Sequence, residues 1–385
     1  MPPRQLIARA PGRVNLIGEH TDYNGGLVLP MAIDLETRIE FVPSDDRIVD
    51  LTLAQTGERA VIDLERRATP STGRRGDWTD YVAGTAWALQ LAGGRVGGFL
   101  GVLSGNLPIG QGLSSSAALE LASAWAFSGG EPPLAAAGSA GDPMAVPEAC
   151  QRAENEFVGV PCGILDQFAV ALGVRDAALL LDCRSLVHRP VRLPAYAAVL
   201  IAESGVARGL RGSGYEERRR ECEAAAAALA RVDSTVRSLR DVAPELLDAA
   251  RDRLDGRLFR RARHVVTENE RVLAAAQAFE AGDLPAAGRA FLASHASLRD
   301  DFEVSVPALD RLVEVAAGIP SVHGARLTGG GFGGAVVVLV DAAAADAVAA
   351  SIRAGYRTPA GGEPVVHRVH AADGAGLVAA GTVAA

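Results

Sequence analysis

The amino-acid sequence predicts an α+β fold divided between two domains. The chain has 385 residues, more than the roughly 250 to 300 at which a single hydrophobic core usually stops growing. Strand-like and helical stretches alternate in its first half, and long helical stretches with an apolar face dominate its second half. The predicted strands include residues 37–42 and 98–103, and the predicted helices include residues 81–91, 117–127, 216–232 and 264–281.

Composition and charge restrict the classes of partner. Apolar residues make up 49% of the chain, which is enough for a proper core. The net charge of −8 argues against a nucleic-acid footprint or a basic membrane surface. The N-terminal residues lack the apolar centre of a signal peptide, and apolar runs such as Ala335 to Val340 are far shorter than a membrane span. We therefore expect a soluble cytoplasmic protein that binds small molecules and neither nucleic acid nor membrane.

The basic residues exclude several mechanisms. All 38 of them are arginines, because the sequence contains no lysine. A Schiff-base lysine, a Walker lysine and the strand lysine of protein kinases are all ruled out. The four cysteines are scattered, without a Cys-x-x-Cys pair or a histidine at zinc-ligand spacing, so we interpret them as reduced thiols.

The first motif is GRVNLIGEHTDYNGG, from Gly12 to Gly26. It joins two apolar strand-like stretches, and binding residues usually lie on such connections. Four hydrogen-bonding side chains lie within ten residues and suit the paired hydroxyls of a polyol. The alternative is a charged hairpin turn, since Asn24-Gly25-Gly26 is itself a turn signal. The four side chains are those of Arg13, Glu19, His20 and Asp22.

The second motif, LPIGQGLSSSAAL, runs from Leu107 to Leu119 between a strand-like stretch and an alanine-rich helical one. Its two spaced glycines let backbone approach an anion, and its three serines offer a helix N-cap, hydroxyls and backbone donors. The pattern predicts a phosphate-binding helix start without a Walker lysine. A glycine-rich turn capped by serine is the alternative. A third run, LTGGGFGG from Leu327 to Gly334, leaves room for a close backbone or ligand approach.

Taken together, the three motifs resemble the galactokinases, a family of the GHMP small-molecule kinase superfamily. The resemblance runs nearly end to end and extends to residues 153–168, 214–222, 261–272 and 294–310. It implies a two-domain GHMP-kinase-like architecture with the active site in the interdomain cleft. The N-terminal domain would cover residues 1–180, with the sugar signature and the ATP-phosphate loop. The C-terminal domain would cover residues 181–385, with LTGGGFGG.

The resemblance also implies a reaction. ATP would phosphorylate the anomeric C1 hydroxyl of D-galactose to galactose 1-phosphate and ADP, the entry step of galactose catabolism. Asp166, in GILDQF, corresponds to the catalytic aspartate and can accept or orient the hydroxyl proton. Arg13 corresponds to the arginine beside it, which can keep the aspartate ionised and offset charge on the transferred group. Early proton transfer and pure transition-state stabilisation both remain open.

The remaining site residues are carried over by position. Mg²⁺ would accompany ATP on Ser116 and Glu154, although Glu154 alone would also fit a solvated helix face. Trp78 and Tyr81 resemble the adenine-side aromatics, with core packing as the alternative. The predicted sugar ligands are Glu19, His20, Asp22, the backbone at Gly163, and Tyr215. The predicted ATP-binding residues are Gly110, Gly112, Leu113, Ser114, Ser115, Ser116, Ala117, Trp78 and Tyr81.

Two departures from the family pattern leave alternatives. Glu203, Ser204 and Arg208 stand where relatives often carry an Asp-Thr type start and a histidine, which would bear on domain packing or substrate selection. Asn155 replaces a histidine often found after the metal-binding glutamate. A kinase for another sugar, such as N-acetylgalactosamine, arabinose or a uronic sugar, and a sugar sensor without turnover are the rival hypotheses. The oligomeric state is open, with a monomer favoured.

Overall fold

The computed structural model describes residues 5–67, 69–134, 142–207 and 214–378 and confirms the mixed α and β architecture. The strands form three sheets, of six, four and three strands. The strands are β1 Leu6–Asn15, β2 Leu27–Val28, β3 Pro30–Ser44, β4 Ile48–Leu53, β5 Arg59–Asp63, β6 Gly98–Gly105, β7 Ala177–Asp182, β8 His188–Arg192, β9 Ala197–Glu203, β10 Val322–Thr328, β11 Ala335–Asp341, β12 Val366–Val369 and β13 Gly376–Val378. The helices are α1 Pro70–Gly73, α2 Thr79–Leu91, α3 Ser115–Phe127, α4 Ala145–Arg152, α5 Leu165–Leu172, α6 Gly214–Leu229, α7 Pro244–Ala249, α8 Gly256–Ala281, α9 Leu284–Asp300, α10 Pro307–Ala317 and α11 Ala345–Gly355.

The six-stranded sheet, in the order β13-β1-β3-β6-β4-β5, positions the first motif. Its longest pairing is the antiparallel one between β1 and β3, whose register shifts between Pro11 and Gly12. A β-bulge of this kind re-aims the side chains that follow it. At Gly12 the strand lies so close to the second motif that an added Cβ would sit 2.4 Å from Leu107 and 2.9 Å from the Leu113 carbonyl. The bulge therefore places Arg13 beside the glycine-serine loop.

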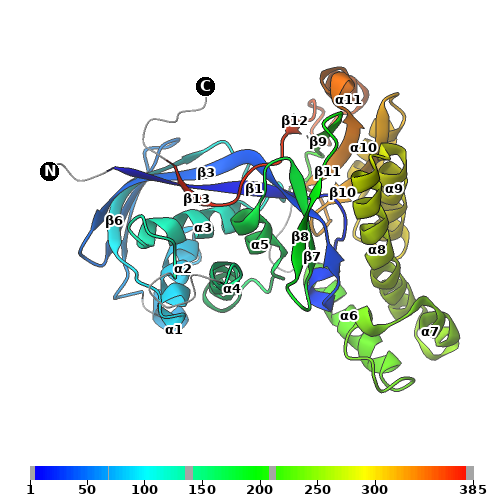
Figure 1. Ribbon diagram of the computed structural model, residues 1–385, viewed down its shortest axis with the longest axis horizontal. Helices are drawn as coiled ribbons and strands as arrows, with labels where there is room; N and C mark the ends of the chain where they lie inside the picture. The colour runs from blue at the N-terminus through cyan, green and yellow to red at the C-terminus, as the bar shows by residue number, and fades with distance from the viewer. Residues whose placement is uncertain (1–4, 68, 135–141, 208–213, 379–385) are drawn as a thin grey trace.

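Two alanine-rich helices, α2 and α3, pack against each other, and α3 also packs against β1 and β3 (Figure 1). Small side chains allow this close approach, and nearly all of α3 is buried. Figure 1 also shows β13, in red, running beside β1, in blue. The pairing is antiparallel and joins Ile7 to Val378. The last described strand thus belongs to the first sheet, although it falls within the predicted C-terminal division, whose limits stay a prediction.

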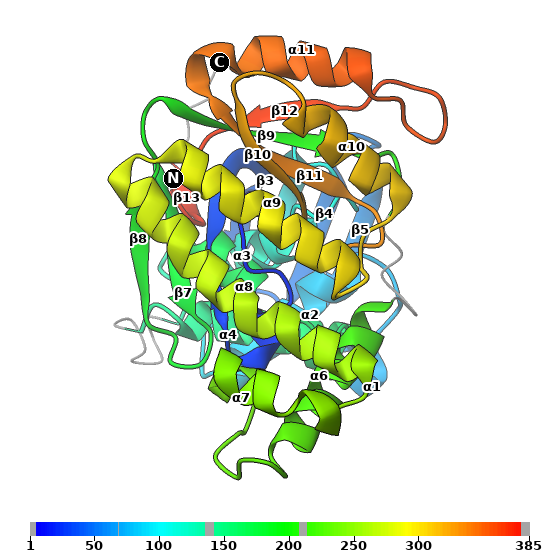
Figure 2. The same ribbon diagram turned by 90° about the vertical axis from the view of Figure 1, so that its right-hand side faces the viewer.

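The four-stranded sheet, β10-β11-β9-β12, carries the third motif at the turn between β10 and β11. Helices α8 and α9 lie side by side, with α9 against β10 (Figure 2). Successive residues of its strands enter different cores, Leu200 in one and Ile201 in the other. This alternation is what a sheet buried on both faces requires.

The predicted start of α8, at residue 264, was eight residues late. The helix begins at Gly256, because the Asp255 side chain caps it by accepting from the Arg257 N–H at 2.8 Å. It ends at residue 281 as expected, before Gly282 with φ of 72°. The first turns of α8 are mostly polar, so the pattern of apolar residues alone did not indicate where the helix begins.

The stretch 128–147 is rich in alanine, glycine and proline, a composition that predicts a surface insertion. Residues 135–141 of it lie outside the described part of the chain. Its described ends are anchored, since Leu134 and Met144 are buried and α4 begins at Ala145. In the described ranges, no helix is both long and apolar enough to cross a membrane.

Candidate active site

A cavity of about 530 Å³ lies where the three motifs meet. The first motif enters it from the end of β1, the second from the start of α3, and the third from the turn after β10. It brings together every predicted site residue except Leu113 and Ala117. The predicted residues that line it are Arg13, Glu19, His20, Asp22, Trp78, Tyr81, Gly110, Gly112, Ser114, Ser115, Ser116, Glu154, Gly163, Asp166 and Tyr215.

Leu113 and Ala117 shape the second motif from behind. Both side chains are buried in the hydrophobic core instead of lining the cavity. The Leu113 carbonyl accepts a hydrogen bond from the Arg13 N–H at 3.1 Å. The loop is thereby tied to β1. The spacing of residues in the sequence could not show whether Leu113 and Ala117 contact a ligand or the protein core.

The glycine-serine loop presents the start of a helix to the cavity. Gly110 and Gly112 have φ values of 78° and 80°, and Ser114 is also left-handed at 60°. These turns place Ser115 at the first position of α3. Backbone N–H groups in the first turn of a helix have no partner within it, and the helix dipole adds positive potential there. This end of the cavity is suited to phosphate groups.

Arg13 and Asp166 form an ion pair inside the cavity. Asp166 lies in the first turn of α5, and its Oδ1 accepts from Arg13 Nε at 2.8 Å and from Nη2 at 2.5 Å. The third guanidinium nitrogen donates to the Gly112 carbonyl, so the pair is tied to the phosphate loop. The Arg13 side chain is only 5% exposed, whereas that of Asp166 is 27% exposed. The carboxylate is therefore held in place yet open to a ligand.

A cluster of carboxyl groups lies behind Asp166. Glu154 lies in the π-helical segment Ala153–Val158, and such bulges often occur at functional sites. The Gln167 amide donates to Glu154 at 2.7 Å and to the buried Glu120 at 3.0 Å. Burial and the charge of Asp166 raise the pKa of Glu154 to about 7, and burial together with Glu154 raises that of Glu120 well above its usual range. Neither Gln167 nor Glu120 was among the predicted site residues, although Gln167 directly follows Asp166.

The donor set fits a magnesium ion. A divalent cation would relieve the repulsion that raises the pKa of Glu154 and favour its charged form. The Ser116 hydroxyl lies near enough to the Glu154 carboxylate to lower its pKa, and both residues line the cavity. In the described ranges, no three His, Cys, Asp or Glu side chains are grouped to hold a metal ion. Mg²⁺ commonly takes one or two protein ligands and completes its shell with phosphates and water.

Glu19 joins the first motif to the third. Its carboxylate forms a buried ion pair with Arg326 and accepts from the Gly329 N–H at 2.8 Å. Burial nevertheless raises the pKa of Glu19, because it outweighs the pairing with Arg326. Arg326 also donates to the Leu16 carbonyl at 3.1 Å. Arg326 immediately precedes LTGGGFGG but was not among the predicted site residues.

His20 and Asp22, also from the first motif, line the cavity. The His20 ring lies 4.6 Å from that of Phe302 and 5.4 Å from that of Tyr215. Asp22 packs on the backbone of Gly163 so closely that an added Cβ there would sit 1.8 Å from Asp22 Oδ2. Burial, with a contribution from Asp166, raises the pKa of Asp22 to about 6.

Trp78 and Tyr81 come from the start of α2. Both line it and both also pack against the main hydrophobic core, so the two readings of these aromatics are compatible. Asp80 shapes the preceding loop by accepting from the N–H groups of Arg75 at 2.8 Å and Gly76 at 2.6 Å. These bonds fix the backbone that leads to Trp78.

The two departures have structural explanations in part. Glu203 pairs with His367 at 2.9 Å, and the Ser204 hydroxyl donates to the Gly334 carbonyl at 2.7 Å, which ties β9 to the third motif. Arg208 lies outside the described residues. Asn155 accepts from the Cys162 N–H at 2.7 Å and so holds the loop beside Gly163. Its amide therefore has a positioning role that the sequence did not indicate.

Comparison with protein families gives three matches along the chain. The galactokinase galactose-binding signature matches residues 2–43, the N-terminal domain of GHMP kinases matches residues 80–174, and the C-terminal domain of GHMP kinases matches residues 275–358. Mevalonate kinase of Methanococcus jannaschii shares the fold at a TM-score of 0.65 and 18% identity, over 96% of this chain and 99% of that one. The two domain matches, on this fold, identify the chain as a small-molecule kinase of the GHMP class.

Two relatives identify the family within the GHMP kinases. A galactokinase of Roseiflexus sp. (strain RS-1) is 42% identical over 373 residues, which cover 97% of this chain and 93% of that protein. The crystal structure of Lactococcus lactis galactokinase, complexed with galactose, superposes with a TM-score of 0.87 at 34% identity, over 97% of this chain and 95% of that one. The chain belongs to the galactokinase family of enzymes.

Proposed function

We propose that the protein transfers the terminal phosphoryl group of ATP to the C1 hydroxyl of D-galactose and releases galactose 1-phosphate and ADP. The observation that carries the proposal is the Arg13–Asp166 pair, held between a helix start suited to phosphate and a wall of sugar-signature side chains. The galactose-bound Lactococcus relative supports the choice of sugar.

In this proposal each end of the cavity has one task. The hydroxyls of galactose bond to His20, Asp22 and Tyr215, with the C1 hydroxyl toward Asp166. The ATP phosphates lie on the first turn of α3, and Trp78 and Tyr81 lie on the adenine side. Asp166 accepts or orients the hydroxyl proton, and Arg13 offsets the charge that develops on the transferred group. Ser116 and Glu154 would hold Mg²⁺, which supplies charge neutralisation on the phosphates.

The test is ADP release with Mg²⁺ and ATP across a panel of galactose, glucose, N-acetylgalactosamine, arabinose, mevalonate and homoserine. We expect a clear preference for galactose and a product phosphorylated at C1, identified by ³¹P NMR. Faster turnover of another member would reassign the substrate to that compound. Binding of galactose without ADP release would indicate a sensor.

Gly163→Ala is expected to weaken galactose binding by about ten- to a hundred-fold, because a lost hydrogen bond to a charged group such as the Asp22 carboxylate costs about 1.5 to 3 kcal/mol. The new Cβ would lie 1.8 Å from Asp22 Oδ2, so the carboxylate has to move. Calorimetry with galactose measures the effect. The matched control is Gly256→Ala, whose Cβ meets nothing within 4 Å. Unchanged galactose affinity in Gly163→Ala would remove Asp22 from the sugar site.

Glu154→Ala is expected to raise the Mg²⁺ concentration needed for half-maximal activity by about ten-fold or more, because an ionised oxygen ligand is lost. A magnesium titration at fixed ATP measures this shift, and thermal unfolding checks the fold. Glu156→Ala is the control, since Glu156 lies in the same π-helical segment with its side chain 59% exposed. A titration curve that coincides with that of the parent protein would exclude Glu154 as a metal ligand.

A further inference from the structure

Two buried arginines donate hydrogen bonds to three consecutive backbone carbonyls, which lie behind the predicted sugar ligands of the cavity. Residues 301–303 follow the last turn of α9. Arg261, on α8, donates to the carbonyl of Asp301. Arg218, on α6, donates to the carbonyl of Phe302 at 2.6 Å and to that of Glu303 at 3.1 Å. We call the two arginines and their contacts the carbonyl clamp.

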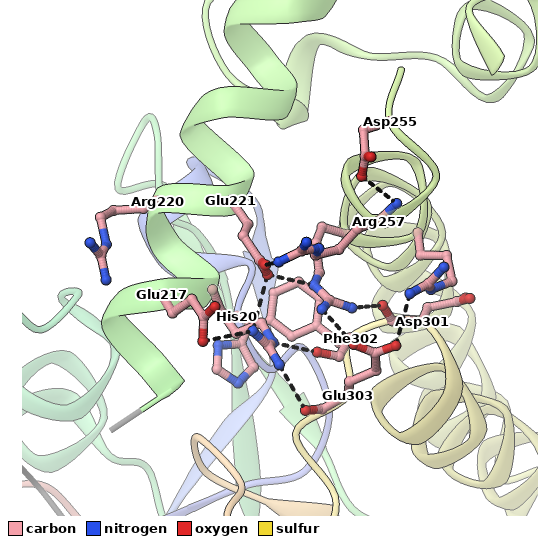
Figure 3. A network of polar contacts seen from close by, with 12 residues as sticks. His20, Glu217, Arg220, Glu221, Asp255, Arg257, Asp301, Phe302 and Glu303 are labelled. Atoms are coloured by element: carbon pink, nitrogen blue, oxygen red, sulfur yellow. Dashed lines mark hydrogen bonds and ion pairs between the residues drawn. The ribbon is translucent and has the colours of Figure 1, made fainter. Parts of the chain in front are cut away.

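The electrostatics explain why the carbonyls are needed. Glu221 lies between the arginines and accepts from Arg261 Nε at 2.7 Å and Arg218 Nη1 at 3.1 Å (Figure 3). Arg218, Arg261 and Glu221 are all at least nine-tenths buried. Glu303 adds a second carboxylate by accepting from Arg261 Nη2 at 2.6 Å, and the guanidinium N–H groups that the two carboxylates leave unpaired would be costly to bury without acceptors. The carbonyls of residues 301–303, at and just beyond the end of α9, supply those acceptors.

The clamp lies behind two of the predicted sugar ligands, His20 and Tyr215. Phe302 is fully buried, and its ring backs the His20 ring (Figure 3) at 4.6 Å. Tyr215 lies on the first turn of α6, three residues before Arg218, and its ring is 5.4 Å from that of His20. Glu303 adopts a φ of 55°, a conformation that non-glycine residues rarely adopt without external constraint. The hydrogen bonds of the clamp supply that constraint.

We propose that Arg218 and Arg261 are positioning residues for sugar binding, which act by holding Phe302 against His20 and α6 at the distance that Tyr215 requires. Neither arginine lines the cavity. The proposal rests on the proposed function, since it takes His20 and Tyr215 as sugar ligands. It extends that function to a layer of residues behind the ligands that the motifs do not include.

The test compares Arg218→Met and Arg261→Met with the control Arg260→Met. Methionine keeps the apolar stem and removes the donors. Arg260 is the neighbour of Arg261 and pairs with the Glu303 carboxylate at 2.8 Å, but it is 38% exposed and holds no carbonyl of residues 301–303. We expect about ten-fold weaker galactose binding by calorimetry in both clamp variants and an unchanged KM for ATP, because the disturbance lies on one side of the cavity. The control should bind galactose normally.

A double-mutant cycle distinguishes positioning from general loss of stability. In a His20→Ala background, Arg218→Met should cost less galactose affinity than in the parent, because the residue it acts through is absent. If a clamp variant fails to fold, Phe302→Leu takes its place in the test. It leaves both arginines intact and should also weaken galactose binding. Equal losses for galactose and ATP, full additivity with His20→Ala, or unchanged galactose binding in both clamp variants or in Phe302→Leu would overturn the proposal. Failure of the parent protein itself to bind galactose would instead overturn the proposed function.

Discussion

Asp166→Asn is expected to lower the turnover number about a hundred- to ten-thousand-fold, the usual contribution of a group that accepts or orients a proton in the transition state. Asparagine keeps the shape of the side chain but loses both its negative charge and its capacity to accept the hydroxyl proton. Galactose and ATP should still bind, because the walls of the cavity remain intact. The measurement is single-turnover ADP formation at saturating galactose and ATP.

The control for this variant is Asp176→Asn. Asp176 is exposed, lies four residues after the end of α5, and has a φ of 60°, which asparagine tolerates. It should show parent-like turnover and unfolding temperature. Near-normal turnover in Asp166→Asn, with its fold verified by thermal unfolding, would assign the proton to another group.

Arg13→Met is expected to lower turnover about a hundred- to thousand-fold, comparable to the removal of a preorganised donor to a developing negative charge. The variant loses the two bonds to Asp166 and the bond to the Gly112 carbonyl together. It also leaves the carboxylate of Asp166 without its counter-charge in a partly buried site. Arg13→Lys should recover only part of the activity, because an ammonium group cannot reproduce the forked geometry.

Arg38→Met provides the comparison for Arg13. Arg38 lies on β3, outside the cavity, and pairs with Glu36. Steady-state kinetics of the three variants, with unfolding temperatures beside them, measure the effect. Full activity in Arg13→Lys would show that the charge alone matters and that the fork does not. A loss in Arg38→Met equal to that in Arg13→Met would point to damage of the sheet instead of the site.

Much of the site could be predicted because its ligand-facing residues lie in short continuous motifs. Local chemistry determines the turns of the second motif, where Gly110, Gly112 and Ser114 take left-handed conformations before a helix start. The same local rules predicted β6 and the helices α2, α3 and α6 to within a few residues. They missed the early start of α8, since a single capping side chain, Asp255, decides it.

The partners of the motif residues could not be predicted, because they come from distant parts of the chain. Arg326 reaches Glu19 across 307 positions, and Gln167 joins Glu120 to Glu154. Nothing in the spacing of these residues distinguishes them from ordinary helix and strand positions. The assignment of Leu113 and Ala117 to ATP binding stays a prediction, and only burial shows that their side chains face the core.

The sequence by itself determined the α+β class, the exclusion of lysine chemistry, the three motifs and the kinase family that they resemble. These properties depend on residue type and short spacing, which act within a few residues of chain. The tertiary structure alone decided that Arg13 meets Asp166 across 153 positions, that β13 returns to the first sheet, and that two buried arginines hold residues 301–303 behind His20. Such contacts arise from the packing of whole sheets and helices, where burial and charge balance select partners that no local pattern specifies.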